Sequence, residues 1–166
     1  RIQKYEPCSG YIQFMFIDLC PQSFYGLYDW WGIPKKGLQA ILESNAPVGV
    51  FAKHKDHLDS LYIVNDTDGA LGECELTWII TETLNGELVE KGSVKAEVPA
   101  DSRVMVKTFE KEYGKGQKWN LTLILSDNNG KCMAKNTYQD ICTLLSRVDG
   151  HPDRMSHEFG MRLYWA

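Results

Sequence analysis

The pattern of apolar positions changes once along the chain, after a predicted helix. Ahead of that helix, residues 9–18 (SGYIQFMFID) are nearly all apolar, which is typical of a strand covered on both faces in a parallel sheet. A loop rich in aromatic residues follows, and Leu38, Ile41 and Leu42 then recur with helical spacing behind a first-turn proline, Pro34. The front of the chain therefore predicts one strand, one loop and one helix.

Behind the helix the period becomes two, which predicts strands bounded by turn-forming residues. The pairs Asn85-Gly86 and Asn129-Gly130 favour the positive φ angles of tight hairpins. Trp78 lies in an alternating stretch, at a position suited to the centre of a core between two sheets. Short strands joined in this way predict an antiparallel, immunoglobulin-like β-sandwich. The predicted strands are 48–54, 60–65, 74–83, 88–98, 103–110, 118–126 and 132–141.

The predicted front strand lacks a partner strand in this sequence. A strand needs neighbours for its backbone hydrogen bonds, and the later strands are joined to one another as hairpins. We therefore expect a C-terminal piece of a larger protein, in which residues 1–46 come from a barrel or doubly wound domain, 47–145 form the sandwich, and 146–166 are a tail packed on it. Alone, the front strand would be disordered, pack on the sandwich, or pair with a second copy as a homodimer.

Composition limits the classes of partner. The chain has 166 residues, 43% of them hydrophobic, and no apolar run approaches the ~20 residues of a membrane helix, so we expect no membrane partner. The net charge of −4 argues against nucleic acid. The five cysteines lack the close spacing of a metal or redox motif, which predicts free, mostly buried thiols. A bridge from Cys74 to Cys132 or Cys142 stays open.

The order of features along the chain resembles the end of a glycoside hydrolase family 2 enzyme, a family that includes β-mannosidases, β-galactosidases, β-glucuronidases and exo-glucosaminidases. The resemblance rests on the stretches 9–21 and 25–41, on Ala46-Pro47 at the start of a sandwich, and on the hairpin phrases at 64–67 and 84–87. It implies that residues 1–46 are the last strand and helix of a TIM barrel, followed by a C-terminal immunoglobulin-like domain. The resemblance covers roughly residues 9–141, and it favours a periplasmic or extracellular location.

The resemblance also implies where the chemistry would lie. The family's mannosidase-like members read Trp-Gln-Leu-Asn-Asp-x-Trp-Pro along the barrel strand, whereas this chain has Phe14 at the tryptophan position and keeps only Asp18 and Pro21. Retaining glycosidases need two carboxylates about 5–5.5 Å apart, one as nucleophile and one as acid/base. In the family both come from earlier barrel strands. The chain alone is therefore expected to be inactive, with no catalytic residue of its own.

Four residues are candidates for substrate binding: Phe14, Asp18, Trp30 and Trp31. Asp18 ends the predicted barrel strand, where binding residues collect, but an aspartate there also bonds nearby loop amides. The two tryptophans either stack on a sugar ring or join the loop to its neighbours as an aromatic staple, and the second interpretation is favoured. Asp29, just before them, is expected to be a turn residue.

The sequence gives little indication of a metal or cofactor site. His54 and His57 lie in a charged turn that is read as solvated, and the aspartates of the hairpin corners lack the spacing of a calcium loop, so we expect neither a metal nor a cofactor. Two hypotheses for function remain. The chain is the C-terminal region of a retaining exo-β-glycosidase, with carbohydrate bound through the missing barrel, or it is an immunoglobulin-like module that binds carbohydrate or protein without chemistry.

Overall fold

The computed structural model describes residues 1–2, 10–22, 25–54, 57–111, 113 and 118–141. They divide into two compact units between Ala46 and Pro47, with Ile2 grouped with the second. We call the first the front unit and the second the sandwich unit. The predicted tail, 146–166, lies outside the described residues.

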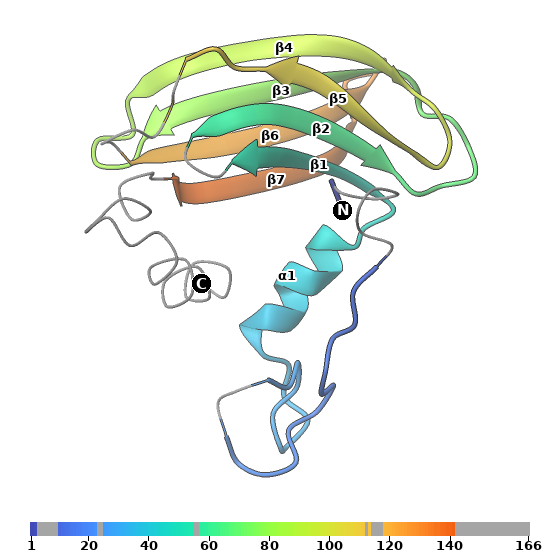
Figure 1. Cartoon of the computed structure of the whole chain (residues 1–166), viewed down its shortest axis with the longest axis vertical. Helices are drawn as coiled ribbons and strands as arrows, with labels where there is room; N and C mark the ends of the chain where they lie inside the picture. The colour runs from blue at the N-terminus through green and yellow to red at the C-terminus, as the bar shows by residue number, and fades with distance from the viewer. Residues whose placement is uncertain (3–9, 23–24, 55–56, 112, 114–117, 142–166) are drawn as a thin grey trace. The chain divides into compact units, whose positions relative to one another are not determined.

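The sandwich unit consists of two antiparallel sheets that face each other (Figure 1). One sheet has the strand order β1-β2-β5 and the other has the order β4-β3-β6-β7. The prediction of a mainly β, immunoglobulin-like sandwich is therefore confirmed. The strands are β1 Val48–His54, β2 Leu58–Asn65, β3 Gly72–Glu82, β4 Leu88–Val98, β5 Ser102–Thr108, β6 Trp119–Asp127 and β7 Cys132–Ile141.

Turn chemistry explains why the predicted and observed strands agree closely. Gly86 and Gly130 have φ angles of 70° and 77°, which a residue without a side chain adopts freely. At the second of these turns, Asp127 Oδ1 accepts hydrogen bonds from the backbone amides of Asn129 (2.8 Å) and Lys131 (2.9 Å). Both predicted hairpin turns thus form, and they fix the ends of the strands on either side.

The core lies between the sheets and follows the alternation of β3 and β6. Leu76, Ile80, Leu121, Leu123 and Leu125 are 0–1% exposed, whereas the alternate residues Thr77, Ile79, Thr122 and Ile124 are only partly buried. Alternation places every second side chain on the same face of a strand, so each strand contributes one apolar row to the core. These two central strands pair along nine positions, from Cys74 opposite Asp127 to Glu82 opposite Trp119.

Trp78 is in the core as predicted, 7% exposed, and its ring fills space that Gly92 leaves on β4. The two residues are directly opposite each other in the sheet, and a Cβ on Gly92 would lie 2.2 Å from Cζ2 of the indole. The indole N–H donates to Glu90 Oε1 at 3.0 Å. Edge-to-face contacts then continue from Trp78 to Phe109, to Tyr113 and to Trp119, with ring centroids 5.7–6.0 Å apart.

Side chains of β7 link the two sheets along one edge. Strand β1 is an edge strand, so part of its backbone has no neighbouring strand to pair with. Asn136 Nδ2 donates to Val50 O at 3.0 Å, and Ala52 N donates to the Tyr138 hydroxyl at 3.0 Å. These bonds satisfy edge groups of β1 with side chains from the other sheet.

Among the described cysteines the thiols are free, and no bridge links Cys74 to Cys132. The expectation that the five cysteines are mostly buried does not hold for the three described ones, because Cys74 is buried while Cys20 and Cys132 are exposed; Cys8 and Cys142 lie outside the described residues. Cys132 opens β7 beside a turn, and Cys20 lies in the loop of the front unit. Burial raises the pKa of the Cys74 thiol, which keeps it protonated.

The front unit contains the helix α1, Lys36–Ser44, but residues 10–18 form no strand. The helix confirms the apolar spacing, with Pro34 just ahead of it rather than in its first turn. The strand does not form because an isolated strand has no ladder: the segment makes one single-residue parallel bridge, Ile17 to Tyr28. The described helix is too short to cross a membrane.

Replacing Gly92 with alanine tests the packing of Trp78. The new methyl group would meet the indole, which overpacks the sheet, and we expect the free energy of unfolding to fall by about 1–3 kcal/mol. Urea unfolding followed by tryptophan fluorescence measures the change. The matched control is Gly69→Ala, where a Cβ meets no atom within 4 Å, and a change below about 0.5 kcal/mol is expected there. Equal effects of the two substitutions would contradict this packing.

Candidate functional site

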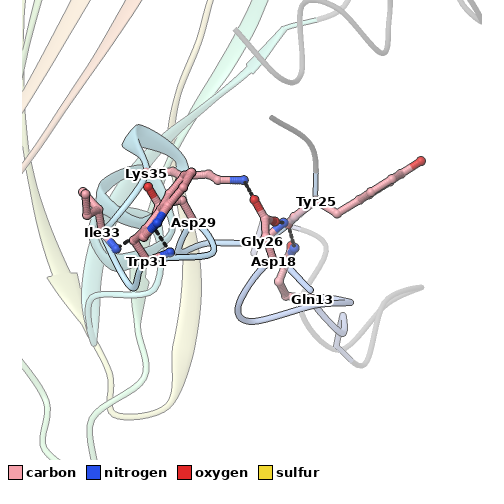
Figure 2. Close-up of polar contacts among 8 residues, drawn as sticks. All are labelled: Gln13, Asp18, Tyr25, Gly26, Asp29, Trp31, Ile33 and Lys35. Atoms are coloured by element: carbon pink, nitrogen blue, oxygen red, sulfur yellow. Dashed lines mark hydrogen bonds and ion pairs between the residues drawn. The ribbon is translucent and has the colours of Figure 1, made fainter. Parts of the chain in front are cut away.

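The four predicted site residues all lie in the front unit, but they differ in how far their side chains are exposed to solvent. Asp18 is buried, with 2% of its surface exposed, whereas Phe14, Trp30 and Trp31 are 78%, 50% and 69% exposed. Figure 2 shows Asp18 and Trp31 in two separate polar networks of the same loop. The structure therefore does not gather the four residues into one pocket.

Asp18 is held by two partners from the loop and the start of the helix (Figure 2). Its Oδ1 accepts a hydrogen bond from Gly26 N at 2.9 Å, and its Oδ2 forms an ion pair with Lys35 Nζ. The Lys35 ammonium, with help from the Gly26 amide, lowers the pKa of the Asp18 carboxyl below its ordinary value of 3.8, although burial opposes the shift. Asp18 is therefore ionised near neutral pH.

Gly26 is needed for this arrangement because the carboxylate approaches its backbone closely. A Cβ at Gly26 would lie 2.2 Å from Asp18 Oδ1 and 2.7 Å from Tyr28 O. The backbone around it adds three hydrogen bonds: Phe16 O accepts from Leu27 N and Tyr28 N, both at 3.0 Å, and Asp18 N donates to Tyr28 O at 3.1 Å. The rings of Phe16 and Tyr28 are 5.0 Å apart. Asp18 is thus the centre of a tightly bonded loop.

Asp29 organises the turn that carries the tryptophans, as expected of a turn residue. Its Oδ1 accepts from Trp31 N at 2.9 Å and from Ile33 N at 2.8 Å, as Figure 2 shows. Its backbone N–H donates to Ile33 O, and its carbonyl accepts from Gly32, whose φ of 78° suits glycine. The turn holds Trp30 and Trp31 at the surface of the loop, where their rings are accessible.

The arrangement of Asp18 and the three aromatic residues is suited to binding a ligand and not to transferring a proton. Both oxygens of Asp18 are occupied and its lowered pKa keeps it charged, so it serves as an acceptor for the loop amide and not as an acid. Phe14, Trp30 and Trp31 offer accessible aromatic faces of the kind on which sugar rings stack. Within the described part of the chain, no three histidine, cysteine or acidic side chains gather as metal ligands.

One feature of the sandwich unit was missed by the sequence analysis. An open hollow of about 200 Å³ is lined by Glu82, Glu87, Leu88, Val89 and Trp119, where β3 turns into β4 and β6 begins. The indole N–H of Trp119 is buried and has no hydrogen-bond partner among the described residues. The β3–β4 hairpin brings Glu82, Glu87 and Leu88 together, and the pairing of Glu82 opposite Trp119 adds the indole, which nothing in the spacing along the sequence indicates.

Comparisons with solved structures show which proteins share this fold. An exo-β-D-glucosaminidase, CsxA, matches with a TM-score of 0.71 and 19% identity over 81% of this chain. The exo-chitosanase CsxA of Amycolatopsis orientalis matches with a TM-score of 0.60 and 19% identity over 69% of the chain. The β-D-mannosidase of Dictyoglomus thermophilum matches with a TM-score of 0.62 and 17% identity over 78% of the chain.

These likenesses establish the fold, and they involve two kinds of enzyme that the sequence resemblance named, an exo-glucosaminidase and a β-mannosidase. The resemblance is thus confirmed at the level of the fold. The chain spans only 13–16% of the length of the enzymes it matches. No protein-family model matches the sequence, and a search of curated proteins gives no significant match.

Replacing Asp18 with asparagine tests the loop. The amide oxygen can still accept from Gly26 N, but the charge that attracts Lys35 is lost. Because the pKa of Asp18 is lowered on folding, its contribution is present above pH 3.8 and is lost as the pH falls through the lower folded value.

We therefore expect a lower protection factor of the Gly26 amide, its exchange rate relative to the intrinsic rate at the same pH, in Asp18→Asn at neutral pH and in the wild type only at more acidic pH, measured by NMR. Asp29→Asn is the matched control, since Asp29 accepts only backbone amides and bonds neither Gly26 nor Lys35. A Gly26 protection factor that changes neither in Asp18→Asn nor on acidification would contradict the role given to the ion pair.

Proposed function

We propose that this chain is the C-terminal region of a retaining exo-β-glycosidase of the glycoside hydrolase family 2 type. In this proposal the front unit supplies the last strand and helix of the catalytic barrel. The sandwich unit is an accessory domain that supports it. The observation that supports the proposal best is the fold shared with an exo-β-glucosaminidase and a β-mannosidase, together with the order of features along the sequence.

The extent of the structural match supports the inclusion of the front unit. A match over 81% of 166 residues corresponds to about 134 residues, whereas only 120 residues run from Pro47 to Ala166. The matched region must therefore begin before Pro47. A free-standing immunoglobulin-like module would match through its sandwich alone, so the longer match favours the glycosidase over the module.

The proposal assigns different tasks to the site residues. Phe14, Trp30 and Trp31 present accessible rings that would border the sugar, as expected for substrate-binding positions. Asp18, with its carboxylate engaged by Gly26 and Lys35, would hold the loop that carries them instead of touching the sugar. The nucleophile and the acid/base would come from barrel strands outside this chain. The chain by itself would then have no hydrolytic activity.

The alternative is a module that binds carbohydrate without chemistry, and the hollow at Trp119 favours it. A hollow lined by two glutamates and a tryptophan is suited to a hydroxyl-bearing or positively charged ligand. Isothermal titration of the chain with β-linked oligosaccharides separates the two functions. Saturable binding that is lost in Trp119→Ala and kept in Trp31→Ala would support the module, and no binding would support the accessory role.

The test of the proposed function is an activity assay on two proteins: this chain, and the longer protein encoded with it. Only the longer protein should release p-nitrophenol from β-D-mannoside or β-D-glucosaminide substrates, and NMR of the product should show retained anomeric configuration. Hydrolysis by the 166-residue chain alone would contradict the assignment of catalysis to the missing strands. A longer protein without any glycosidase activity would contradict the proposed function itself.

A further inference from the structure

We propose that the hollow at Trp119 is the docking site of this chain's own C-terminal tail, and that residues 143–147 (TLLSR), the crossing segment, occupy it. In this arrangement Leu145 would pack against the apolar part of the lining, and Arg147 would pair with the two glutamates. The inference concerns the sandwich unit alone and does not rest on the proposed function.

The strand register brings the end of β7 to the hollow. The described residues end at Ile141, the last residue of β7, which is paired with Trp119, and Trp119 is paired on its other side with Glu82. Neighbouring strands lie about 4.8 Å apart, so the chain leaves β7 about 5 Å from the backbone of Trp119 and about 10 Å from that of Glu82. Six residues extend up to about 20 Å, so Arg147 can reach both glutamates.

The hollow offers an apolar wall and two carboxylates that have little else to bind. Leu88, which is 58% exposed, forms part of the lining. Among the described residues the Glu82 carboxylate has no hydrogen bond or ion pair, and that of Glu87 accepts only from the side chain of Asn85, at 3.2 Å. An occupant with one apolar and one cationic side chain matches this lining, because it covers the leucine and pairs with the carboxylates.

The indole N–H of Trp119 also needs an acceptor. It is buried, and the described residues offer it none. Buried donors are nearly always bonded, because leaving one unpaired costs free energy. The crossing segment begins two residues after the partner of Trp119 in β7, so one of its backbone carbonyls would pass close enough to accept this bond.

The crossing segment has the side chains that this lining requires. In an extended segment every second side chain points to the same face, so Leu145 and Arg147 share one face and Leu144 lies on the other. Arg147 is also the first cation after β7. Because the cost of closing a loop grows with its length, this arginine is favoured over the cations farther along the tail.

Other occupants fit the hollow less well. The stretch 114–117 (GKGQ), just ahead of Trp119 in the sequence, has a cation but no apolar side chain for the lining. A free ligand or a second copy lacks the short covalent connection that gives the crossing segment a high effective concentration at the hollow. The chain's own tail would therefore fill the hollow and keep a carbohydrate out of it.

NMR of the 166-residue chain tests the docking. Nuclear Overhauser contacts should link the Trp119 indole N–H to the crossing segment. Leu145→Asp puts a charge against an apolar wall and beside two glutamates, so the amides of the segment should exchange about tenfold faster. The matched control is Leu144→Asp, on the opposite face, where the change should stay below about twofold. Equal effects of the two variants, or indole contacts to residues 114–117 instead, would overturn the proposal.

A charge reversal tests the ion pair without placing a charge against the apolar wall. Arg147→Glu brings a third negative group to the two glutamates, so exchange of the crossing segment should become severalfold faster, and adding Glu82→Arg should slow it again. The matched control is Arg154→Glu, which makes the same change of charge farther along the tail and should leave the rate unchanged. An equal effect of Arg154→Glu, or no rescue by Glu82→Arg, would overturn the pairing.

A mixture of isotope-labelled and unlabelled chains decides between the chain's own tail and a second copy. The contacts to the Trp119 indole should arise within one chain. Contacts between a labelled and an unlabelled chain would overturn the choice of occupant. None of these measurements depends on glycosidase activity, so the docking and the proposed function can fail separately.

Discussion

The structure depends on one constraint: a strand is stable only when its backbone groups are paired and its apolar side chains are covered. The sandwich unit satisfies both conditions internally, through antiparallel pairing of its strands and a core that β3 and β6 supply from the middle of the larger sheet. The apolar segment of residues 11–17 in the front unit satisfies neither. It is as apolar as a buried strand, yet it has no ladder and its side chains are exposed.

This contrast explains why apolar residues form paired strands in the sandwich unit and none in the front unit. In the sandwich, Trp78 and Gly92 interlock, and side chains of β7 bond two backbone groups on the free edge of β1. In the front unit, the polar groups of the loop are satisfied instead. Asp18 binds Gly26 and Lys35, and Asp29 closes the turn of the tryptophans. The loop is thus organised by its own polar groups and by the backbone bonds of Phe16 and Asp18 to Leu27 and Tyr28.

Much of the sandwich could be predicted from sequence because its signals are local. The bounds of β1, β4 and β7 agree with the prediction to the residue, since turn formers flank each strand. The start of β2 was predicted two residues late, because the charged turn before it hides Leu58, which is buried and donates to Tyr113 O. Leu58 and Tyr113 lie far apart in the sequence, so no local sequence pattern indicates their contact.

For the candidate site, the sequence predicted which residues take part but not which partners they contact. Asp18 and Asp29 were recognisable as loop residues, but the partners Gly26 and Lys35 lie 8 and 17 positions from Asp18, at spacings that imply no secondary structure. The hollow at Trp119 depends on strand register, and the exposure of Cys20 and Cys132 depends on which face each residue takes. All of these follow from tertiary structure, which a single sequence does not specify locally.

The most direct test of the central claim is the backbone NMR spectrum of the 166-residue chain at a concentration where sedimentation shows a monomer. The account predicts strand-type chemical shifts and cross-strand contacts for β1 to β7, and neither for residues 11–17. Strand-type shifts for residues 11–17, with cross-strand contacts to any strand of the sandwich in that monomer, would contradict it.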